Sequence, residues 1–374
     1  MKYKFEDIIF NITEKKKPVE EDKYNYIGLE HLESGNLFIS KWGSDTAPEG
    51  EKIVMKKGDV LFGKRRAYQK KVAISPIDGI FSAHGMVLRP KEDVICKEFL
   101  PFFISSEAFL NEAIRISVGG LSPTVNWKDI RELEFDLPPL AEQKVLAEKL
   151  WAAYEVKQSY LKMIDATEEM VKAQFVEMFG TINTPQGKLI TLGNLCNIQR
   201  GGSPRPIKDY ITNDSNGINW IKIGDTDESM YITKTEEKIK PSGLNKTRQV
   251  YAGDLLLSNS MSFGKPYILK IDGCIHDGWL VLHINDESVL TQIYLCAYLS
   301  QKSTYMAMSK LASGGVVQNL NSEIVKSLPV ILPPIQKQKE YIALLDQADK
   351  SISELRKSVD AIDKVIKSLI NENL

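Results

Sequence analysis

The sequence predicts an α+β protein with two similar mixed α/β domains, joined by two long antiparallel helices that form an intramolecular coiled coil with pseudo-twofold symmetry. Two observations predict this fold. A Leu-Pro-Pro-aliphatic segment followed by a Gln occurs twice, and each copy opens a long run of apolar residues at helical spacing. A chain of 374 residues also exceeds the ~250 residues that one hydrophobic core usually holds, so at least two domains are expected.

The repeat is visible well beyond these two segments. LPPLAEQ from Leu137 and LPPIQKQ from Leu332 lie 195 residues apart, and upstream residues recur at the same offset. The matching pairs are Gly58-Asp59 with Gly253-Asp254, Leu61 with Leu256, Leu100 with Leu295, Ser105 with Ser300, Gly119-Gly120 with Gly314-Gly315, Asn126 with Asn321, Leu133 with Leu328 and Gln143 with Gln338. Nearer the start the offset falls to 194. We infer a duplicated half, with chance similarity of two α/β segments as the alternative.

We expect each half to contain short strands, then a helix, a Gly-Gly loop and a strand that leads to the prolines. In the first half this helix is expected near 97–116. Pro139 and Pro334 suit the first helical turn, because proline loses no hydrogen bond there and its φ is already helical. Gly180 is placed to end the first long helix. The expected globular domains are 1–137 and 181–332, and the long helices fall in 138–180 and 333–374.

Apolar residues in the second long helix alternate in steps of three and four, which is the period of a coiled-coil seam. This seam comprises Leu345, Ala348, Ile352, Leu355, Val359, Ile362, Ile366 and Leu369. The packing residues expected in the first helix are Leu146, Leu150, Ala153, Tyr160 and Ile164. Because one helix leads to the second domain and the other must return, the pair is expected to be antiparallel. The alternative is a coiled coil between two copies of the chain.

Composition and charge exclude several classes of protein. The chain has no run of ~18 apolar residues, and the opening MKYKFEDIIF is too charged for a signal peptide, which predicts a cytoplasmic protein that binds no membrane. The four cysteines form no CxxC pair and are expected to be free thiols. The segment CIHDGWLVLH lacks the ligand spacing of a metal site, so no metal is expected. A net charge of −1 limits any nucleic-acid site to a local patch.

Two similar domains at a fixed separation suit two sites on duplex DNA, whose major-groove faces recur every ~34–36 Å. Arg and Lys contact phosphates and guanine, and a Gln amide reads adenine. In the first half the candidate contacts, in GKRRAYQKK, are Lys64, Arg65, Arg66, Tyr68, Gln69, Lys70 and Lys71. In the second half they are Asn259, Ser260, Phe263 and Lys265 in the matching loop, with Arg200 and Arg205 in QRGGSPRP. The alternative for each is a solvated turn with incidental charge.

The GDVLF and GDLLL segments, the Gly-Gly loops, the two Leu-Pro-Pro helix starts and the paired helices resemble the specificity subunit of type I restriction–modification enzymes, over nearly the whole chain. The resemblance implies a non-catalytic subunit whose two target recognition domains bind the halves of a split, asymmetric double-stranded DNA target. It implies that the helices, here 139–179 and 334–369, set the spacer and dock two modification subunits, which methylate adenine with S-adenosylmethionine. Restriction subunits, which use ATP and Mg²⁺, join separately.

Missing motifs agree with a chain that has no catalytic residues and no cofactor of its own. Both Pro-Pro pairs follow Leu, so the Asn/Asp-Pro-Pro-aromatic motif of a self-sufficient adenine methyltransferase is absent. No GxxxxGK[ST] phosphate loop occurs either. Two rival hypotheses stay open from sequence: a coiled-coil interaction scaffold that does not bind DNA, and a solitary DNA-modifying enzyme.

Overall fold

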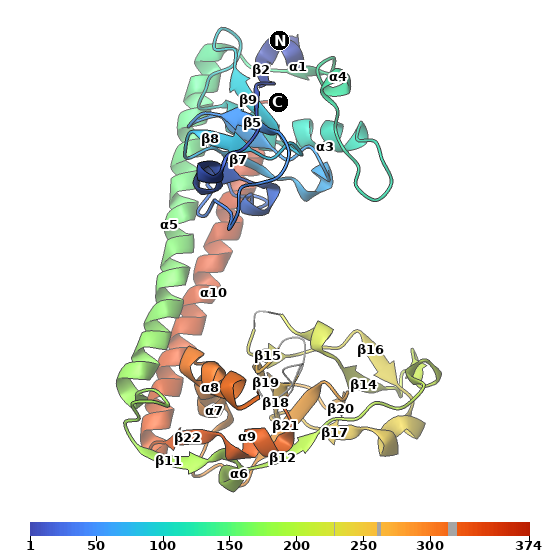
Figure 1. Ribbon diagram of the computed structural model, residues 1–374, viewed down its shortest axis with the longest axis vertical. Coiled ribbons are helices and arrows are strands. Elements are labelled where there is room, and N and C mark those ends of the chain that lie inside the picture. The colour runs from blue at the N-terminus through green and yellow to red at the C-terminus, as the bar shows by residue number, and fades with distance from the viewer. Residues whose placement is uncertain (228, 260–262, 313–319) are drawn as a thin grey trace. The chain divides into compact units, whose positions relative to one another are not determined.

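The computed structural model describes residues 1–227, 229–259, 263–312 and 320–374. It divides into two compact units: unit 1 comprises Met1–Met163 and Leu355–Leu374, and unit 2 comprises Ile164–Glu354 (Figure 1). Each unit therefore contains one globular domain together with part of both long helices.

Unit 1 is built on two four-stranded sheets. One has the order β2-β9-β6-β7, and the other has the order β3-β5-β8-β4, in which β4 and β8 run parallel. The strands are β1 Lys2–Lys4, β2 Ile9–Ile12, β3 Lys15–Lys16, β4 Tyr26–Ile27, β5 Lys52–Met55, β6 Val60–Phe62, β7 Val72–Ile74, β8 Gly79–Phe81, β9 Met86–Pro90 and β10 Glu134–Asp136. The helices are α1 Phe5–Ile8, α2 Leu100–Ser105, α3 Glu107–Arg115 and α4 Trp127–Ile130, with 3-10 turns η1 Glu20–Asn25, η2 Leu29–His31 and η3 Ala67–Gln69.

Unit 2 has two five-stranded sheets, ordered β12-β21-β18-β19-β15 and β13-β16-β14-β20-β17. The strands are β11 Lys188–Thr191, β12 Cys196–Arg200, β13 Ile211–Thr212, β14 Ile218–Ile221, β15 Tyr231–Ile232, β16 Glu237–Ile239, β17 Arg248–Val250, β18 Leu255–Ser258, β19 Pro266–Leu269, β20 Gly273–Ile275, β21 Trp279–Ile284 and β22 Pro329–Leu332. The helices are α6 Leu192–Leu195, α7 Gln292–Leu299, α8 Lys302–Ala312 and α9 Ser322–Ser327, with 3-10 turns η4 Ile207–Asp209, η5 Ile223–Asp225 and η6 Pro241–Lys246.

The central strands of the two units pair in the same way. In unit 1, β4 runs parallel to β8 with Tyr26 opposite Ile80, and in unit 2, β14 runs parallel to β20 with Trp220 opposite Cys274, each 194 residues later. The order β2-β9-β6-β7 likewise matches β12-β21-β18-β19. Unit 2 adds β15 at the edge of one sheet, and β16 with the edge strand β13 beside β14 in the other. The two units therefore share their central topology, while Gly314-Gly315 lie outside the described residues.

A buried glutamine joins each long helix to its own domain. Gln143 is 1% exposed, and its Nε2 donates to the carbonyls of Val94 at 3.0 Å and Pro138 at 2.9 Å. Its Oε1 accepts the backbone N–H of Cys96 at 2.8 Å. Three backbone groups that would otherwise be buried without partners are thereby satisfied by one side chain.

Gln338 does the same in unit 2 with partners 195 residues further along. Its Nε2 donates to the carbonyls of Val289 at 2.8 Å and Pro333 at 3.0 Å, and its Oε1 accepts the N–H of Thr291 at 3.0 Å. The side chain is 0% exposed. The Gln that follows each Pro-Pro pair is therefore a structural residue, and the repeat preserves its complete hydrogen-bond set.

The two long helices are α5 Leu140–Phe179 and α10 Ile335–Asn371. The carbonyl of Pro139 accepts from the N–H of Gln143, so the helical residues of α5 begin one position after the proline that was expected in the first turn. Gly180, with φ of 74°, follows the last helical residue, as the sequence predicts.

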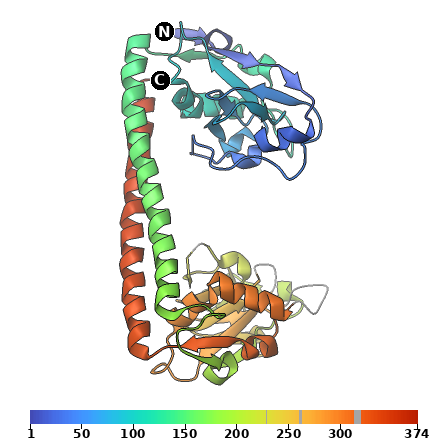
Figure 2. The same cartoon turned by 60° about the vertical axis from the view of Figure 1, so that its left-hand side comes forward.

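Within each unit the helices run antiparallel and lie side by side in both views (Figure 1 and Figure 2). In unit 1, the start of α5 meets the end of α10, where Lys157 Nζ lies 2.7 Å from Asp363 Oδ1. In unit 2, the end of α5 meets the start of α10, where the Phe175 and Tyr341 rings pack edge to face at 5.1 Å. The pairing is thus made within one chain. The expected packing residues are all buried or half-buried, namely Leu146, Leu150, Ala153, Tyr160, Ile164, Leu345, Ile352, Leu355, Val359, Ile362, Ile366 and Leu369.

The prediction of a single helix near 97–116 is wrong, because two helices, α2 and α3, occupy this segment. Ser106 separates α2 from α3 with an extended backbone, φ −67° and ψ 154°. Its hydroxyl accepts the N–H of Phe109 at 3.1 Å and donates to the carbonyl of Phe103 at 2.6 Å. The serine therefore caps α3 and closes α2, a local competition for backbone groups that the apolar pattern does not reveal.

Candidate nucleic-acid interface

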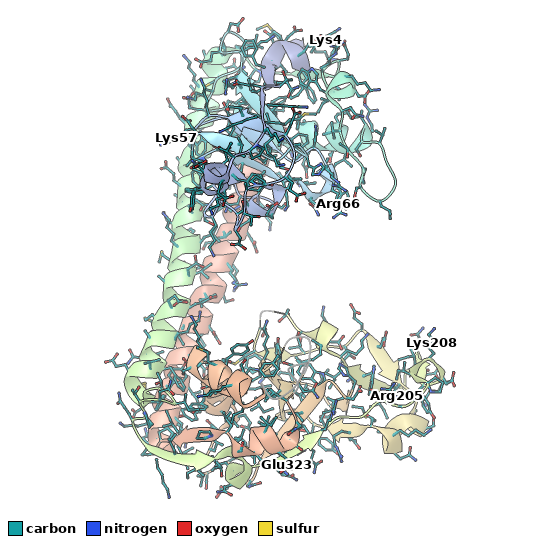
Figure 3. All side chains as sticks on the ribbon, in the orientation of Figure 1. Lys4, Lys57, Arg66, Arg205, Lys208 and Glu323 are labelled. Atoms are coloured by element: carbon teal, nitrogen blue, oxygen red, sulfur yellow. The ribbon has the colours of Figure 1, made fainter. Side chains whose placement is uncertain are left out.

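The connection between β6 and β7 in unit 1 holds the basic segment singled out from sequence. Ala67 is 1% exposed and fixes the η3 turn against the domain. Arg66 and Lys70 flank this turn with left-handed φ values of 56° and 51°. Arg66, Tyr68 and Lys70 are exposed, with Arg66 at the surface in Figure 3, while the other four candidates are half-buried. These four are Lys64, Arg65, Gln69 and Lys71.

Two other loops hold this segment in place by backbone hydrogen bonds. The N–H of Val125 donates to the carbonyl of Lys64 at 3.0 Å, and the N–H of Arg66 donates to the carbonyl of Pro123 at 2.7 Å. The N–H of Arg65 donates to the carbonyl of His84 at 3.1 Å. Segments more than 50 residues apart in sequence, around residues 64–66 and 123–125, therefore meet at one surface together with the turn before β9.

The side chains of this surface differ in whether other residues of the protein already occupy their hydrogen-bond donors. Arg65 Nη1 lies 3.2 Å from His84 Nε2, and Arg66 Nε donates to Ser122 Oγ at 3.2 Å. Each guanidinium has five N–H donors, so donors are left over for a ligand. Among the described residues, neither arginine forms an ion pair with a carboxylate. Lys71 Nζ donates to the carbonyl of Leu29 at 2.7 Å and so has a structural partner.

The electrostatics of the surface are positive. Burial, and then the charges of Arg65, Lys64 and Lys52, lower the pKa of His84 below its ordinary value. Burial and the neighbouring charge of Lys15 lower the pKa of Lys64. Clustered cations that disfavour one another are stabilised by an anion, and phosphate is the anion that Arg and Lys bind on nucleic acids.

In the equivalent connection of unit 2, between β18 and β19, two of the candidate side chains are buried. Asn259 is 0% exposed, and its Nδ2 donates to the carbonyl of Asp277 at 2.8 Å. Phe263 is 9% exposed and packs edge to face on Tyr305 at 5.9 Å. Lys265 is exposed, whereas Ser260 lies outside the described residues. In this conformation the buried Asn259 and Phe263 support the loop, and Lys265 is the candidate available to a ligand.

Asp277, in the turn before β21, gathers the two arginines predicted in unit 2. Arg200 Nε donates to its carbonyl at 3.1 Å, and Arg205 Nη2 lies 3.4 Å from its Oδ2. Ser203 Oγ donates to its Oδ1 at 2.7 Å, and this hydrogen bond is the main cause that lowers the pKa of Asp277. With Asn259 also bound to its carbonyl, one residue joins three of the sequence candidates.

An open pocket of about 880 Å³ lies next to this group. Its lining comprises residues 203–207, Trp220, residues 222–224, His276 and Asp277. Arg205 and Lys208 are both at the surface of unit 2 (Figure 3). Over the described ranges of the chain, no three His, Cys, Asp or Glu side chains gather as a metal site requires, and every helix there is too short or too polar to cross a membrane.

A family model described as the type I restriction modification DNA specificity domain matches the chain twice, at residues 2–159 and 188–362. This chain belongs to that family. The specificity-domain model thus covers the globular domain of unit 1 and the globular domain of unit 2 separately, each with long-helix residues.

Two relatives are similar to this specificity-domain protein over most of their length. The type I restriction enzyme MjaVIII specificity subunit of Methanocaldococcus jannaschii is 22% identical over 398 residues, which covers 98% of this chain and 89% of the relative. The type I restriction enzyme EcoKI specificity subunit of Escherichia coli K12 is 25% identical over 361 residues, which covers 86% of this chain and 72% of the relative.

Solved structures share the fold of this specificity-domain protein. A chain from a type I R-M system, solved to explain complex assembly and conformational transition, has a TM-score of 0.62 at 21% identity and covers 100% of this chain and 97% of its own. The type I restriction-modification system S subunit from M. genitalium has a TM-score of 0.52 at 13% identity, covering 99% of this chain and 94% of its own.

The site residues predicted from the sequence did not include Asp277, Ser122 or His84. Ser122 belongs to the loop after the Gly-Gly pair, and His84 and Asp277 belong to the turns before the equivalent strands β9 and β21. A usable signal was present, since the duplication aligns the two turns at the offset of 194. Each turn precedes a buried strand and so lies at a sheet end, where loops form binding surfaces.

Proposed function

We propose that this chain is the DNA-recognition subunit of a type I restriction–modification assembly, in which unit 1 and unit 2 each read one part of a split, asymmetric target. The single observation that carries the proposal is the double match to a DNA specificity domain. The two matched domains share their central topology and differ in the loops that follow β6 and β18. One scaffold with two different loop surfaces suits two different base sequences.

On this proposal, 1–137 and 181–332 are the target recognition domains, and 138–180 and 333–374 are the spacer helices. Arg65 and Arg66 hold phosphates in unit 1 with their remaining donors, and Tyr68 and Gln69 lie within the same loop for base contacts. In unit 2, Arg200, Arg205 and Lys265 supply positive charge, part of which Asp277 already neutralises. The chain itself carries out no chemistry, which is left to partner subunits.

The proposal is tested by co-expressing the chain with its modification subunit and mapping methylated adenines in cellular DNA. We expect methylation at a split sequence whose two parts are unrelated and separated by a fixed spacer. Methylation that needs no copy of this chain, or that occurs at a continuous target, contradicts the proposal. The purified assembly should also lose duplex affinity steeply as salt rises, because phosphate contacts release counterions. A scaffold without DNA contacts shows no such loss.

We further propose that modification subunits dock on an exposed apolar row of α5. Apolar side chains are exposed on this helix although other residues of α5 already pack in the cores of both units. These exposed residues are Val145, Val156, Met163, Met170 and Val176. Val156, Met163 and Met170 are spaced by seven, which is the repeat of a seam that a partner helix covers.

Replacing Val156 and Met170 together by Glu should abolish co-purification of the modification subunit, because two charges would be buried in the interface. The matched control is Lys162→Glu, which places a negative charge at an exposed position of the same helix outside this row. Mass measurement of the wild-type assembly should give two modification subunits for each copy of this chain. Equal capture by the double variant and the control contradicts the docking proposal.

A further inference from the structure

Unit 1 exposes one leucine almost completely. Leu121 is 96% exposed and lies in the middle of the loop between α3 and α4, which projects from the body of the unit (Figure 1). The loop is the turn of a short antiparallel hairpin, in which the N–H of Val118 donates to the carbonyl of Thr124 at 3.1 Å and the reverse bond measures 2.9 Å. A single exposed apolar side chain is common on protein surfaces, so the role of Leu121 must be argued from the residues around it.

The hairpin is anchored at its base by the basic segment described above. Thr124 pairs with Arg65 as well as with Val118, so three chain segments lie side by side. Arg66 holds the near side of the turn through its backbone N–H to Pro123 and its Nε to Ser122. Arg65 therefore lies at the base of the hairpin, the Arg66 side chain reaches Ser122 next to the tip, and Leu121 occupies the tip itself.

This order of charge and apolar surface matches the depth of a DNA groove. Leu121 is three residues from either bridged residue, and an extended chain advances ~3.3 Å per residue, so the tip reaches up to about 10 Å beyond the base. The grooves of B-DNA are about 7.5–8.5 Å deep. When Arg65, which is bridged to Thr124 at the base of the hairpin, meets a phosphate at the rim of the groove, the tip reaches the base edges.

Groove width selects the major groove. A two-stranded ribbon fits the major groove, which is about 12 Å wide, but not the minor groove of about 6 Å. Within the major groove, the thymine C5-methyl is the apolar group that the base edges display. Leu121 has no hydrogen-bonding atoms on its side chain, so apolar contact with this methyl is the base-specific interaction open to it.

We propose that Leu121 packs against a thymine methyl in the major groove and makes that thymine part of the sequence read by unit 1. This inference rests on the proposed function and adds a residue that determines specificity. The contact buries roughly one methyl of the base, and burial of such a group changes affinity about fourfold. Truncation of the whole leucine side chain to alanine should weaken binding on the order of tenfold.

The test uses the full-length chain with its modification subunit and a duplex selected by this assembly from a randomised pool. Each thymine of the selected duplex is replaced in turn by uracil, which removes only the methyl group, and the dissociation constant is measured for wild type, Leu121→Ala and Leu189→Ala. Leu189 is a leucine of unit 2 that is 41% exposed and serves as the matched control. We expect one thymine at which uracil weakens wild type and Leu189→Ala about fourfold but leaves Leu121→Ala unchanged.

Other outcomes separate the two proposals. If the wild-type assembly selects a sequence but every uracil substitution affects Leu121→Ala as much as wild type, the thymine contact is overturned and the proposed function stands. A selected sequence without a thymine overturns the contact in the same way. If the wild-type assembly selects no sequence, the proposed function fails and this inference fails with it. Because the leucine is exposed, Leu121→Ala should keep the wild-type unfolding transition.

Discussion

The equivalent connections β6–β7 and β18–β19 share one main-chain hydrogen bond and differ in the use of their described side chains. The carbonyl of Lys64 accepts the N–H of Val125 at 3.0 Å, and the carbonyl of Asn259, 195 residues later, accepts the N–H of Leu320 at 3.1 Å. Around this common bond, unit 1 exposes cations, whereas unit 2 buries the side chain of Asn259 completely. The duplicated scaffold therefore preserves main-chain contacts, and the surface that a ligand would meet has diverged.

Charge pairing differs in the same way. Among the described residues, Arg65 and Arg66 have no carboxylate partner, while Arg205 shares Asp277 with Ser203. The first surface therefore presents its positive charge to solvent, and the second has part of its charge neutralised.

The largest effect is expected where the units are alike. Gln143→Ala and Gln338→Ala should each lower the free energy of unfolding by about 3–5 kcal/mol, because two buried carbonyls and one N–H lose their partner. Urea denaturation measures this loss, and the exposed Gln347→Ala serves as the control. A large effect in one unit and none in the other would show that the same hydrogen bonds do not stabilise the two units equally.

A second pair of equivalent residues should be unequal. Asp59 is 4% exposed and binds Arg89 through two bonds of 2.6 and 2.8 Å, whereas Asp254 is 14% exposed and lies 2.8 Å from His283. Arg89→Ala leaves a buried carboxylate without its cation and should cost about 3 kcal/mol of unfolding free energy. His283→Ala should cost about 1 kcal/mol. Equal losses in urea denaturation would contradict this difference.

DNA binding should depend more on the arginines without carboxylate partners. Arg65→Ala with Arg66→Ala should weaken the assembly on DNA by about 30-fold and reduce the salt dependence by about two phosphate contacts, without changing subunit assembly. Arg200→Ala with Arg205→Ala should have a smaller effect, because both arginines already contact Asp277. Arg131→Ala, on the surface of unit 1 beside Glu132, is the control. A larger loss from the unit 2 pair would reverse the comparison.

The smallest effect concerns His84, which has no histidine counterpart in the turn position of Gly278. Its pKa is lowered in the folded protein, so the unfolded state binds protons first as the solution is acidified. The contribution of His84 to stability is therefore present above its ordinary pKa of ~6.5 and is lost as pH falls through the folded value. Arg65→Ala should raise the pKa of His84, because it removes a positive charge that disfavours protonation of the ring.

An NMR titration of the His84 ring in wild type and in Arg65→Ala measures this shift. Bound DNA should raise the same pKa further, because phosphates favour the protonated ring. A titration that is identical in all three samples would show that the cations around His84 do not act on it.

The sequence predicted the architecture because the relevant signals are local or periodic. The heptad steps of α10, the prolines before each helix and the recurring Gln are read directly from spacing. The same methods merged α2 and α3 into one helix, since the capping hydroxyl of Ser106 competes with the backbone in a way that apolar periodicity does not record. The family was also recognisable from the order of these segments.

By itself, then, the sequence determined the duplication, the antiparallel long helices and the class of protein, because spacing and connectivity constrain them. The tertiary structure decided which candidate side chains are available. Asn259 is buried by segments 18 and more residues away, Lys71 donates its amine to Leu29, and Leu121 stands exposed beside Arg66. Whether a candidate side chain can meet a ligand depends on which distant segments pack against it. The pattern of residues along the sequence does not show which segments these are.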